Sequence, residues 1–223
     1  MSEWALERRH PRYPVRLPVL YKGLDPAPGR AGVGWTRDLS EGGACLELAE
    51  RLEPMSTLDL ALRTDDGSVE LEAEVAWAAE PGPVGQAVLH GVGFTHLGEL
   101  HRKAFHDLLI HKGHTRFEGL RLPLELPVLC RPMGMADPVL QGRTGDVSRG
   151  GLLLLLPEVI PPGFTLRVSI QTTRGGVEAE GIIAWVGSAE AKSPGRLVRH
   201  GFKFTDISWP NQMTLGLLLA EMP

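Results

Sequence analysis

The sequence has few cysteines, few aromatic residues and no long hydrophobic run. Two cysteines among 223 residues cannot form a disulfide framework, and they fit a reducing compartment. The longest purely aliphatic run, Leu152 to Leu156, is far shorter than the ~20 residues that span a membrane. The first 14 residues also lack the apolar segment of a signal peptide. These absences predict a cytoplasmic protein without membrane insertion.

Glycine and proline are abundant instead. The 27 glycines and 18 prolines make up about one fifth of the chain, against roughly 12% in average proteins. A hydrophobic content of 43% is too high for a disordered chain, and the glycines show no three-residue period. The composition therefore indicates many turns between short strands.

Charge is unevenly distributed along the chain. Residues 1–22 carry five basic and two acidic side chains, a net +3, so the remaining chain carries −4 − 3 = −7. An acidic body with 6% aromatic residues argues against nucleic-acid binding, which needs a basic surface and stacking side chains. The basic arm suits a small anionic ligand, although a solvated tail would explain the charge equally well.

The chain contains an internal repeat. The segments TRDLSEGG (36–43) and TGDVSRGG (144–151) are identical at five of eight positions, 108 residues apart. The same offset relates Trp77 to Trp185, and HGVGFT (90–95) resembles HGFKFT (200–205). Two copies of one domain explain these matches. We place the first domain at residues 1–112 and the second at 113–223.

Each copy has the pattern of a mostly β domain. Apolar residues alternate with glutamates from Val69 to Trp77, which is typical of a strand with one wet face, and the second copy repeats this at 177–185. Helical periodicity follows at 97–109 and again at the C-terminus. The patterns predict an antiparallel barrel or sandwich with a terminal helix in each copy. They place Trp77 and Trp185 in the core, and they predict Cys45 and Cys130 as buried small hydrophobes.

Two short motifs add a family resemblance. An RxxxR segment runs from Arg8 to Arg12, and a DxSxxG segment runs from Asp38 to Gly43. In this order, inside a repeated β domain, they resemble tandem PilZ domains, the bacterial receptors for the second messenger cyclic di-GMP. The resemblance implies two antiparallel six-stranded β-barrels, each followed by a C-terminal α-helix.

The motif residues suit this ligand chemically. A guanidinium fork binds a phosphate or the N7/O6 edge of guanine, and the Asp38 carboxylate can accept from the guanine N1 and N2 donors. Ser40 adds a small polar group, and glycines permit a tight turn and close ligand approach. With Arg9 as a helper outside the strict motif, the predicted cyclic di-GMP site comprises Arg8, Arg9, Arg12, Asp38, Ser40, Gly42 and Gly43.

The second copy departs from this pattern. Alignment of Arg121 with Arg12 puts Phe117 at the position of Arg8 and Glu118 at that of Arg9, so RxxxR is missing. We therefore expect a degenerate second copy with a structural or partner-binding role. A rearranged site would use the weaker candidates Arg116, Arg121, Asp146, Ser148 and Gly151.

The leucine run of the second copy is apolar on both strand faces, unlike the corresponding segment of the first copy. The outer residues Leu153 and Leu155 must therefore be covered. Contact with the first copy, the linker helix or a second chain is one hypothesis. Coverage by the C-terminal helix of the same copy is the other.

The sequence thus favours a cyclic di-GMP receptor that pulls its arm onto the barrel and signals to a downstream protein partner. The competing hypothesis is a PilZ-type adaptor that acts without nucleotide, through protein contacts. In either case we expect a downstream protein partner or self-association through the second domain. We expect no enzyme, because no nucleophile-elbow sequence surrounds Ser40. We expect no cofactor or metal either, because His101, His106, His111 and His114 lack a third ligand at a suitable spacing.

Overall fold

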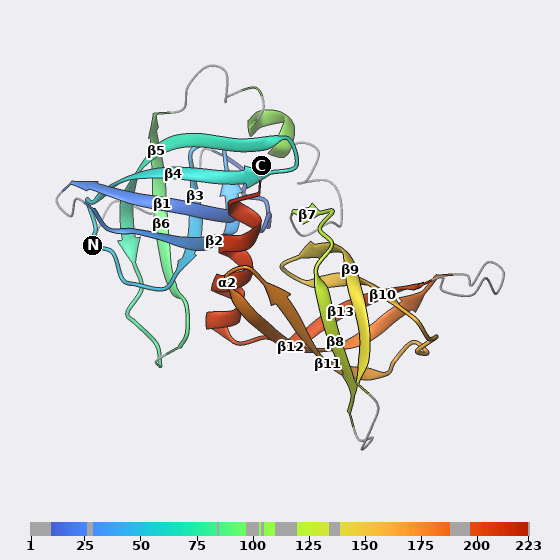
Figure 1. Cartoon of the computed structure of the whole chain (residues 1–223). Coiled ribbons are helices and arrows are strands. Elements are labelled where there is room, and N and C mark those ends of the chain that lie inside the picture. The colour runs from blue at the N-terminus through green and yellow to red at the C-terminus, as the bar shows by residue number, and fades with distance from the viewer. Residues whose placement is uncertain are drawn as a thin grey trace. The chain divides into compact units, whose positions relative to one another are not determined.

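A computed structural model gives the fold of the chain. It describes residues 10–25, 29–83, 85–96, 103, 105–109, 120–133, 139–187 and 197–222. The chain divides into two compact units, residues 1–119 and 120–222 (Figure 1).

The first unit is a closed barrel of six antiparallel strands. The strands follow the ring order β1-β2-β3-β6-β5-β4. Their bounds are Pro18–Asp25 (β1), Ala31–Ser40 (β2), Gly43–Leu48 (β3), Thr57–Thr64 (β4), Gly67–Ala78 (β5) and Val88–His96 (β6).

The second unit repeats this ring. Strand β10 pairs with both β9 and β13, which closes six strands into a barrel, and the short β7 adds to β9. Their bounds are Arg121–Leu122 (β7), Pro127–Pro132 (β8), Leu140–Ser148 (β9), Gly151–Leu156 (β10), Thr165–Thr172 (β11), Gly175–Val186 (β12) and Val198–Asp206 (β13). The predicted pair of six-stranded antiparallel barrels is therefore confirmed.

The alternating sequence pattern determines which side chains fill each barrel. Along β5, Val69, Leu71, Ala73 and Val75 are buried, whereas the glutamates between them are exposed or half-buried. The hairpins before β5 and β12 turn at Gly67 and Gly175, whose φ angles of 126° and 123° are open to glycine but rarely to other residues. The period of two thus identified the core face of these strands correctly.

The two repeated tryptophans are an exception, and the prediction that they lie in the core is wrong. Trp77 and Trp185 are 45% and 46% exposed. The pairing register of β5 shifts between Val75 and Trp77, and that of β12 shifts at the same place. Such a β-bulge turns the next side chain to the other face. Each indole lies over a glycine of the neighbouring strand, Gly91 or Gly201.

A helix follows each barrel. In the second unit α2, Trp209–Ala220, buries Leu215, Leu218 and Leu219. In the first unit, the described helical residues are 103 and 105–109. This segment packs on the barrel, because the Phe105 ring meets Phe94 edge-on at 5.6 Å. Within the described ranges, no helix is long and apolar enough to cross a membrane.

The outer leucines of β10 are better covered than the pattern suggested. Leu153 is only 7% exposed and Leu155 is half-buried. The Leu153 side chain occupies the space that a side chain at Gly145 on β9 would fill, and Leu153 pairs with Gly201 on the other neighbouring strand, β13. Two glycines of the second barrel itself therefore give Leu153 room on the outer surface. What else covers these leucines stays a hypothesis.

Candidate functional site

A buried threonine fixes the segment that leads into the first barrel. The Thr36 hydroxyl donates to the Val15 carbonyl at 2.6 Å and accepts from the Leu17 amide at 2.8 Å. Further out, Tyr13 and Leu39 exchange two backbone hydrogen bonds of 2.8 and 2.9 Å. The end of the arm therefore runs along β2, and it brings Arg12 to the start of the DxSxxG motif.

Arg12 and Asp38 form an ion pair on the outside of the barrel. Arg12 Nη1 donates to Asp38 Oδ1 at 2.6 Å, with 37% and 27% of the two side chains exposed. A β-bulge between Thr36 and Asp38 interrupts the pairing with β3, as is common where a side chain must be re-aimed. The pair joins the two predicted motifs, and it uses one donor of the guanidinium fork.

The turn after β2 is built without room for larger residues. The Ser40 hydroxyl donates to the Gly43 carbonyl at 3.0 Å and closes the turn. A Cβ at Gly43 would overlap the Val92 carbonyl oxygen on β6, so glycine is required there for close packing. Gly42 is exposed and lies beside the His10 ring, because a Cβ added at Gly42 would lie 3.2 Å from His10 Cδ2. The turn therefore presents backbone directly beside the Arg12–Asp38 pair.

Glu41 connects three parts of this region, which the sequence did not predict. Its carboxylate oxygens lie 3.2 Å from His10 Nδ1 in the arm and 3.1 Å from His106 Nδ1 in the helical segment 105–109. Glu41 occupies a variable position of the motif, so nothing in the pattern singled it out. Within the described residues, no group of three His, Cys, Asp or Glu side chains could hold a metal.

Cys45 and Trp77 extend the surface away from Asp38. On successive neighbouring strands, Asp38 (β2) pairs with Cys45 (β3), Cys45 with Gly91 (β6), and Gly91 with Trp77 (β5). Burial, and then the Asp38 charge, raise the pKa of Cys45 to about 11, so the thiol stays protonated at neutral pH. We call these four residues the outer row. It has a carboxylate at one end, a neutral floor in the middle and an exposed indole at the other end.

The second barrel reproduces the same geometry. Arg121 Nη1 donates to Asp146 Oδ1 at 2.6 Å, and the Ser148 hydroxyl donates to the Gly151 carbonyl at 2.9 Å. A Cβ at Gly151 would overlap a β13 carbonyl oxygen, as at Gly43. Leu153 replaces the cysteine of the outer row, which makes the floor bulkier and fully apolar. The described part of the second copy therefore retains the turn and the ion pair.

The structure thus brings together most of the predicted residues. In the first copy these are Arg12, Asp38, Ser40, Gly42 and Gly43, and in the second they are Arg121, Asp146, Ser148 and Gly151. Arg8, Arg9 and Arg116 lie outside the described residues, as do Phe117 and Glu118. The degeneracy of the second copy rests on the missing arginine alone and stays a prediction.

Two buried histidines were also missed. His90 Nε2 accepts from the Leu52 amide at 3.0 Å, and His90 Nδ1 donates to the Val88 carbonyl at 3.1 Å. His200 makes the same two bonds in the second barrel. Burial lowers the pKa of both histidines. The sequence signal for these histidines was the His-Gly pair that begins both HGVGFT and HGFKFT. Because both copies keep this pair, it indicates a structural role for the histidine rather than a contact with a ligand.

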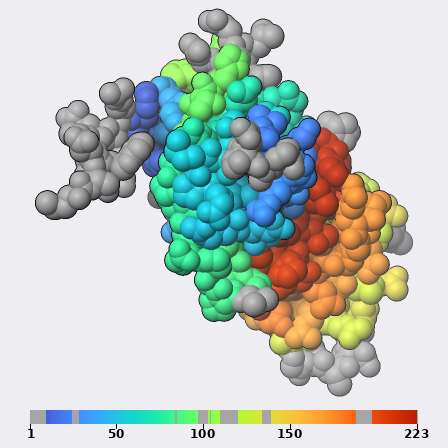
Figure 2. Space-filling model, turned by 90° about the vertical axis from the view of Figure 1, so that its left-hand side faces the viewer, coloured from blue at the N-terminus to red at the C-terminus, as the bar shows by residue number. Residues whose placement is uncertain are grey.

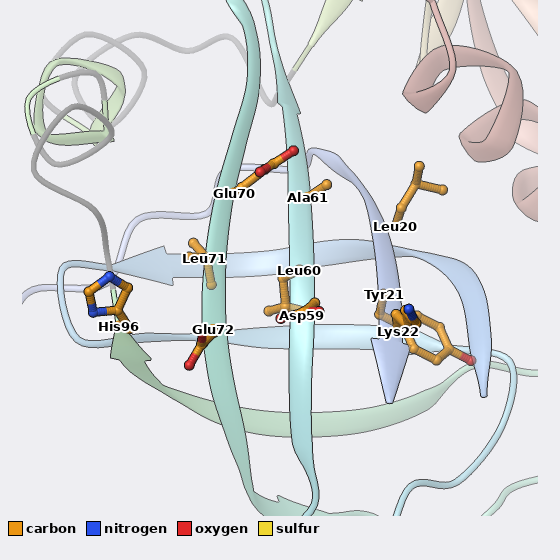
Figure 3. A pocket seen from close by; sticks show the side chains of 10 residues that line it. All are labelled: Leu20, Tyr21, Lys22, Asp59, Leu60, Ala61, Glu70, Leu71, Glu72 and His96. Carbon is orange, nitrogen blue, oxygen red and sulfur yellow. The ribbon is translucent and has the colours of Figure 1, made fainter. Parts of the chain in front are cut away.

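A separate groove lies on β1, β4, β5 and β6 of the first barrel. It has a volume of about 540 Å³, and Figure 3 shows the polar and apolar side chains that line it. Lys22, Asp59, Glu72 and His96 pair in sequence across these four strands. None of the predicted ligand-binding residues lines this groove. The groove is therefore distinct from the candidate site.

The chain was compared with known proteins. The PilZ domain family model matches residues 6–111 and 116–221. Comparison with curated protein sequences gave no match.

Solved structures similar to this chain include two that match over most of its length. The Borreliella burgdorferi PlzA protein in complex with c-di-GMP is 13% identical, with 91% of this chain and 86% of that chain covered and a TM-score of 0.42. The Bacillus subtilis inhibitor of motility (MotI/DgrA) is 11% identical, with 92% and 95% covered and a TM-score of 0.39. Because both TM-scores are below 0.5, the assignment rests on the family model. The chain belongs to the PilZ domain family and carries two copies of the domain in tandem.

Proposed function

We propose that this protein is a cyclic di-GMP receptor whose first domain, residues 1–112, binds the dinucleotide and which signals to a protein partner. The observation that carries the proposal is the Arg12–Asp38 pair beside the Ser40–Gly43 turn. A cation, a carboxylate and exposed backbone are thereby held on one outer surface. These are the groups that phosphate and guanine edges require.

The geometry suggests a role for each group. Arg8, Arg9 and Arg12 bind phosphate and the guanine N7/O6 edge, and Asp38 accepts from the guanine N1 and N2 donors. The Trp77 indole, at the far end of the outer row, offers an exposed face on which a base can stack. Because the site acts by binding alone, we propose no catalytic step.

Signal transmission follows from the position of the arm. Fixing a backbone residue costs about 1–2 kcal/mol, so a ligand must offset this cost for each residue that it orders. The segment from Tyr13 onward is already held by Leu39 and Thr36. The proposed ligand therefore acts on the arm before Tyr13, where His10 and Arg12 contact Glu41 and Asp38, and the repositioned arm changes the surface that a partner reads.

For the second domain, residues 113–223, we propose a partner-binding or structural role without dinucleotide. It keeps the turn and the Arg121–Asp146 pair, but it lacks the arginine that corresponds to Arg8. A single cationic fork leaves one phosphate without a bidentate partner. This difference is the reason to expect that one domain, and not both, is occupied.

One observation favours the alternative of a nucleotide-independent adaptor. Arg12 and Asp38 already satisfy one another at 2.6 Å, so the site is stable without a ligand. Calorimetric titration of cyclic di-GMP into the full chain separates the two functions. The receptor predicts saturable binding that an Arg8→Ala/Arg12→Ala variant loses. Equal heats from both proteins, or none from either, would leave the adaptor as the better account.

A further inference from the structure

The second unit exposes a group of large apolar side chains at one end of its barrel. They lie in the described parts of the three connections β8–β9, β10–β11 and β12–β13. These connections meet at one end, because Met133 donates its amide to Thr165 at 3.0 Å and Leu156 pairs with Val198. We call this group the apolar rim. It comprises Met133, Val139, Val159, Phe164 and Leu197, with exposed fractions of 47%, 37%, 57%, 41% and 37%.

The opposite end of the same barrel is covered by α2. Arg149, in the β9–β10 turn, donates to Gln212, and Arg174, in the β11–β12 turn, forms an ion pair of 2.6 Å with Glu221. Figure 2 shows α2, in red, lying against the orange strands of this barrel. The helix therefore protects one end, while the rim side chains at the other end remain exposed.

The first copy serves as an internal control for the rim. The rim residues align with Leu24 for Met133, Ala31 for Val139, Arg51 for Val159, Ser56 for Phe164 and Ala87 for Leu197. Among the described connections at this end of the first barrel, Met55 is the single large apolar side chain that is exposed. The same barrel thus closes with smaller or polar side chains at most of these positions. The rim is not needed for folding, and exposed apolar patches of this kind mark contact surfaces.

We propose that the rim binds the rim of a second copy of this chain, related by a two-fold axis. A two-fold contact requires a surface that is complementary to itself. Two exposed side chains of opposite charge, Glu158 and Arg199, flank the rim, and neither forms an ion pair in the described part of the chain. In the dimer, Glu158 of each copy faces the partner's Arg199 across an apolar centre.

The size of the rim sets the expected strength of the dimer. Five partly exposed side chains present on the order of a few hundred Å² of apolar surface. Counted on both copies, this stays below about 1,200 Å², in the size range of weak and transient interfaces. The dimer should therefore be reversible and concentration-dependent. The proposal does not rest on dinucleotide binding, because the rim contains none of the residues assigned to that site.

Sedimentation equilibrium of the full chain, without nucleotide, tests the proposal. We expect a reversible monomer–dimer equilibrium. A Val159→Arg/Phe164→Ser variant, which carries the residues of the first copy, should raise the dissociation constant roughly tenfold or more. Met55→Ser, at the same end of the first barrel, is the matched control and should leave the constant unchanged.

Charge reversal tests the choice of a second copy as the partner. Glu158→Arg and Arg199→Glu should each weaken the dimer, and the two changes together should restore it, because the facing charges are exchanged. A wild-type chain that stays monomeric at every concentration would overturn the proposal, whether or not it binds another protein or lipid. So would a charge-reversed double variant that dimerises no better than its parents. These variants alter exposed residues, so thermal unfolding should confirm that they fold.

Discussion

Replacing Arg12 by alanine should separate the site's contribution to binding from its contribution to stability. The chain provides a matched control at Arg121. Both arginines donate to the motif aspartate at 2.6 Å, and their side chains are 37% and 48% exposed. The two ion pairs therefore have the same geometry and similar solvent screening. They differ in that only Arg12 belongs to an RxxxR segment.

The magnitudes follow from this exposure. An ion pair between exposed side chains contributes about 0.2–1 kcal/mol to the free energy of unfolding, so each alanine variant should lose no more than that. A charged hydrogen bond to a bound ligand is worth about 1.5–3 kcal/mol, which corresponds to a roughly tenfold to hundredfold weaker dissociation constant. Arg12→Ala should show the loss of affinity for cyclic di-GMP, and Arg121→Ala should not.

Urea unfolding and calorimetric titration on the same preparations measure the two quantities. The account predicts similar small stability losses in both variants and a loss of affinity in Arg12→Ala alone. If Arg12→Ala bound as tightly as wild type, the assignment of Arg12 to the ligand would be refuted. If Arg121→Ala lost as much affinity as Arg12→Ala, the second domain would be the site, or an equal site.

Three further results are expected. Burial lowers the pKa of His90 and His200 in the folded chain, so the unfolded chain takes up protons first as the pH falls. The free energy of unfolding should therefore fall as pH drops below about 6.5 and stay level above it. Urea titrations at several pH values check this, and a His90→Gln/His200→Gln variant with the same pH dependence of stability as wild type would contradict it. Met55 has a left-handed φ of 68°, and the second copy has Gly163 at the same place with a φ of 87°. Met55→Gly should stabilise the chain by about 0.5–1 kcal/mol, because the backbone strain that it relieves exceeds the conformational entropy that glycine adds to the unfolded chain. A lower urea midpoint in the variant would show that the strain is absent. Gly43→Ala should destabilise the chain by about 1–3 kcal/mol, because the alanine Cβ would overlap a β6 carbonyl oxygen. Calorimetry should also show weaker cyclic di-GMP binding. A melting temperature equal to that of wild type would argue against this packing.

Much of the fold could be predicted from the sequence because strand periodicity and repetition are local signals. The alternation along Val69–Val75 depends only on which face of one strand is wet. The 108-residue offset then transfers each assignment to the second copy. The position of Trp77 could not be predicted in this way, because a single extra residue in a bulge inverts the faces that follow it.

The parts of the site that were missed depend on contacts between distant segments. Thr36 and Thr144 occupy the same place in the two motifs, but their bonds to the incoming arm form only when the barrel closes. Glu41 reaches His106 across 65 positions of the sequence. The motif residues Asp38, Ser40 and Gly43 could be named in advance because one turn holds them together.

The central claim is that the first domain holds the dinucleotide. Hydrogen–deuterium exchange of the full chain, with and without saturating cyclic di-GMP, tests it most directly, because the two copies provide equivalent turns for comparison. The account predicts slower exchange at residues 38–45 and in the arm around Arg12, with no change at residues 146–153. Protection confined to residues 146–153, or absent from both turns, would contradict it.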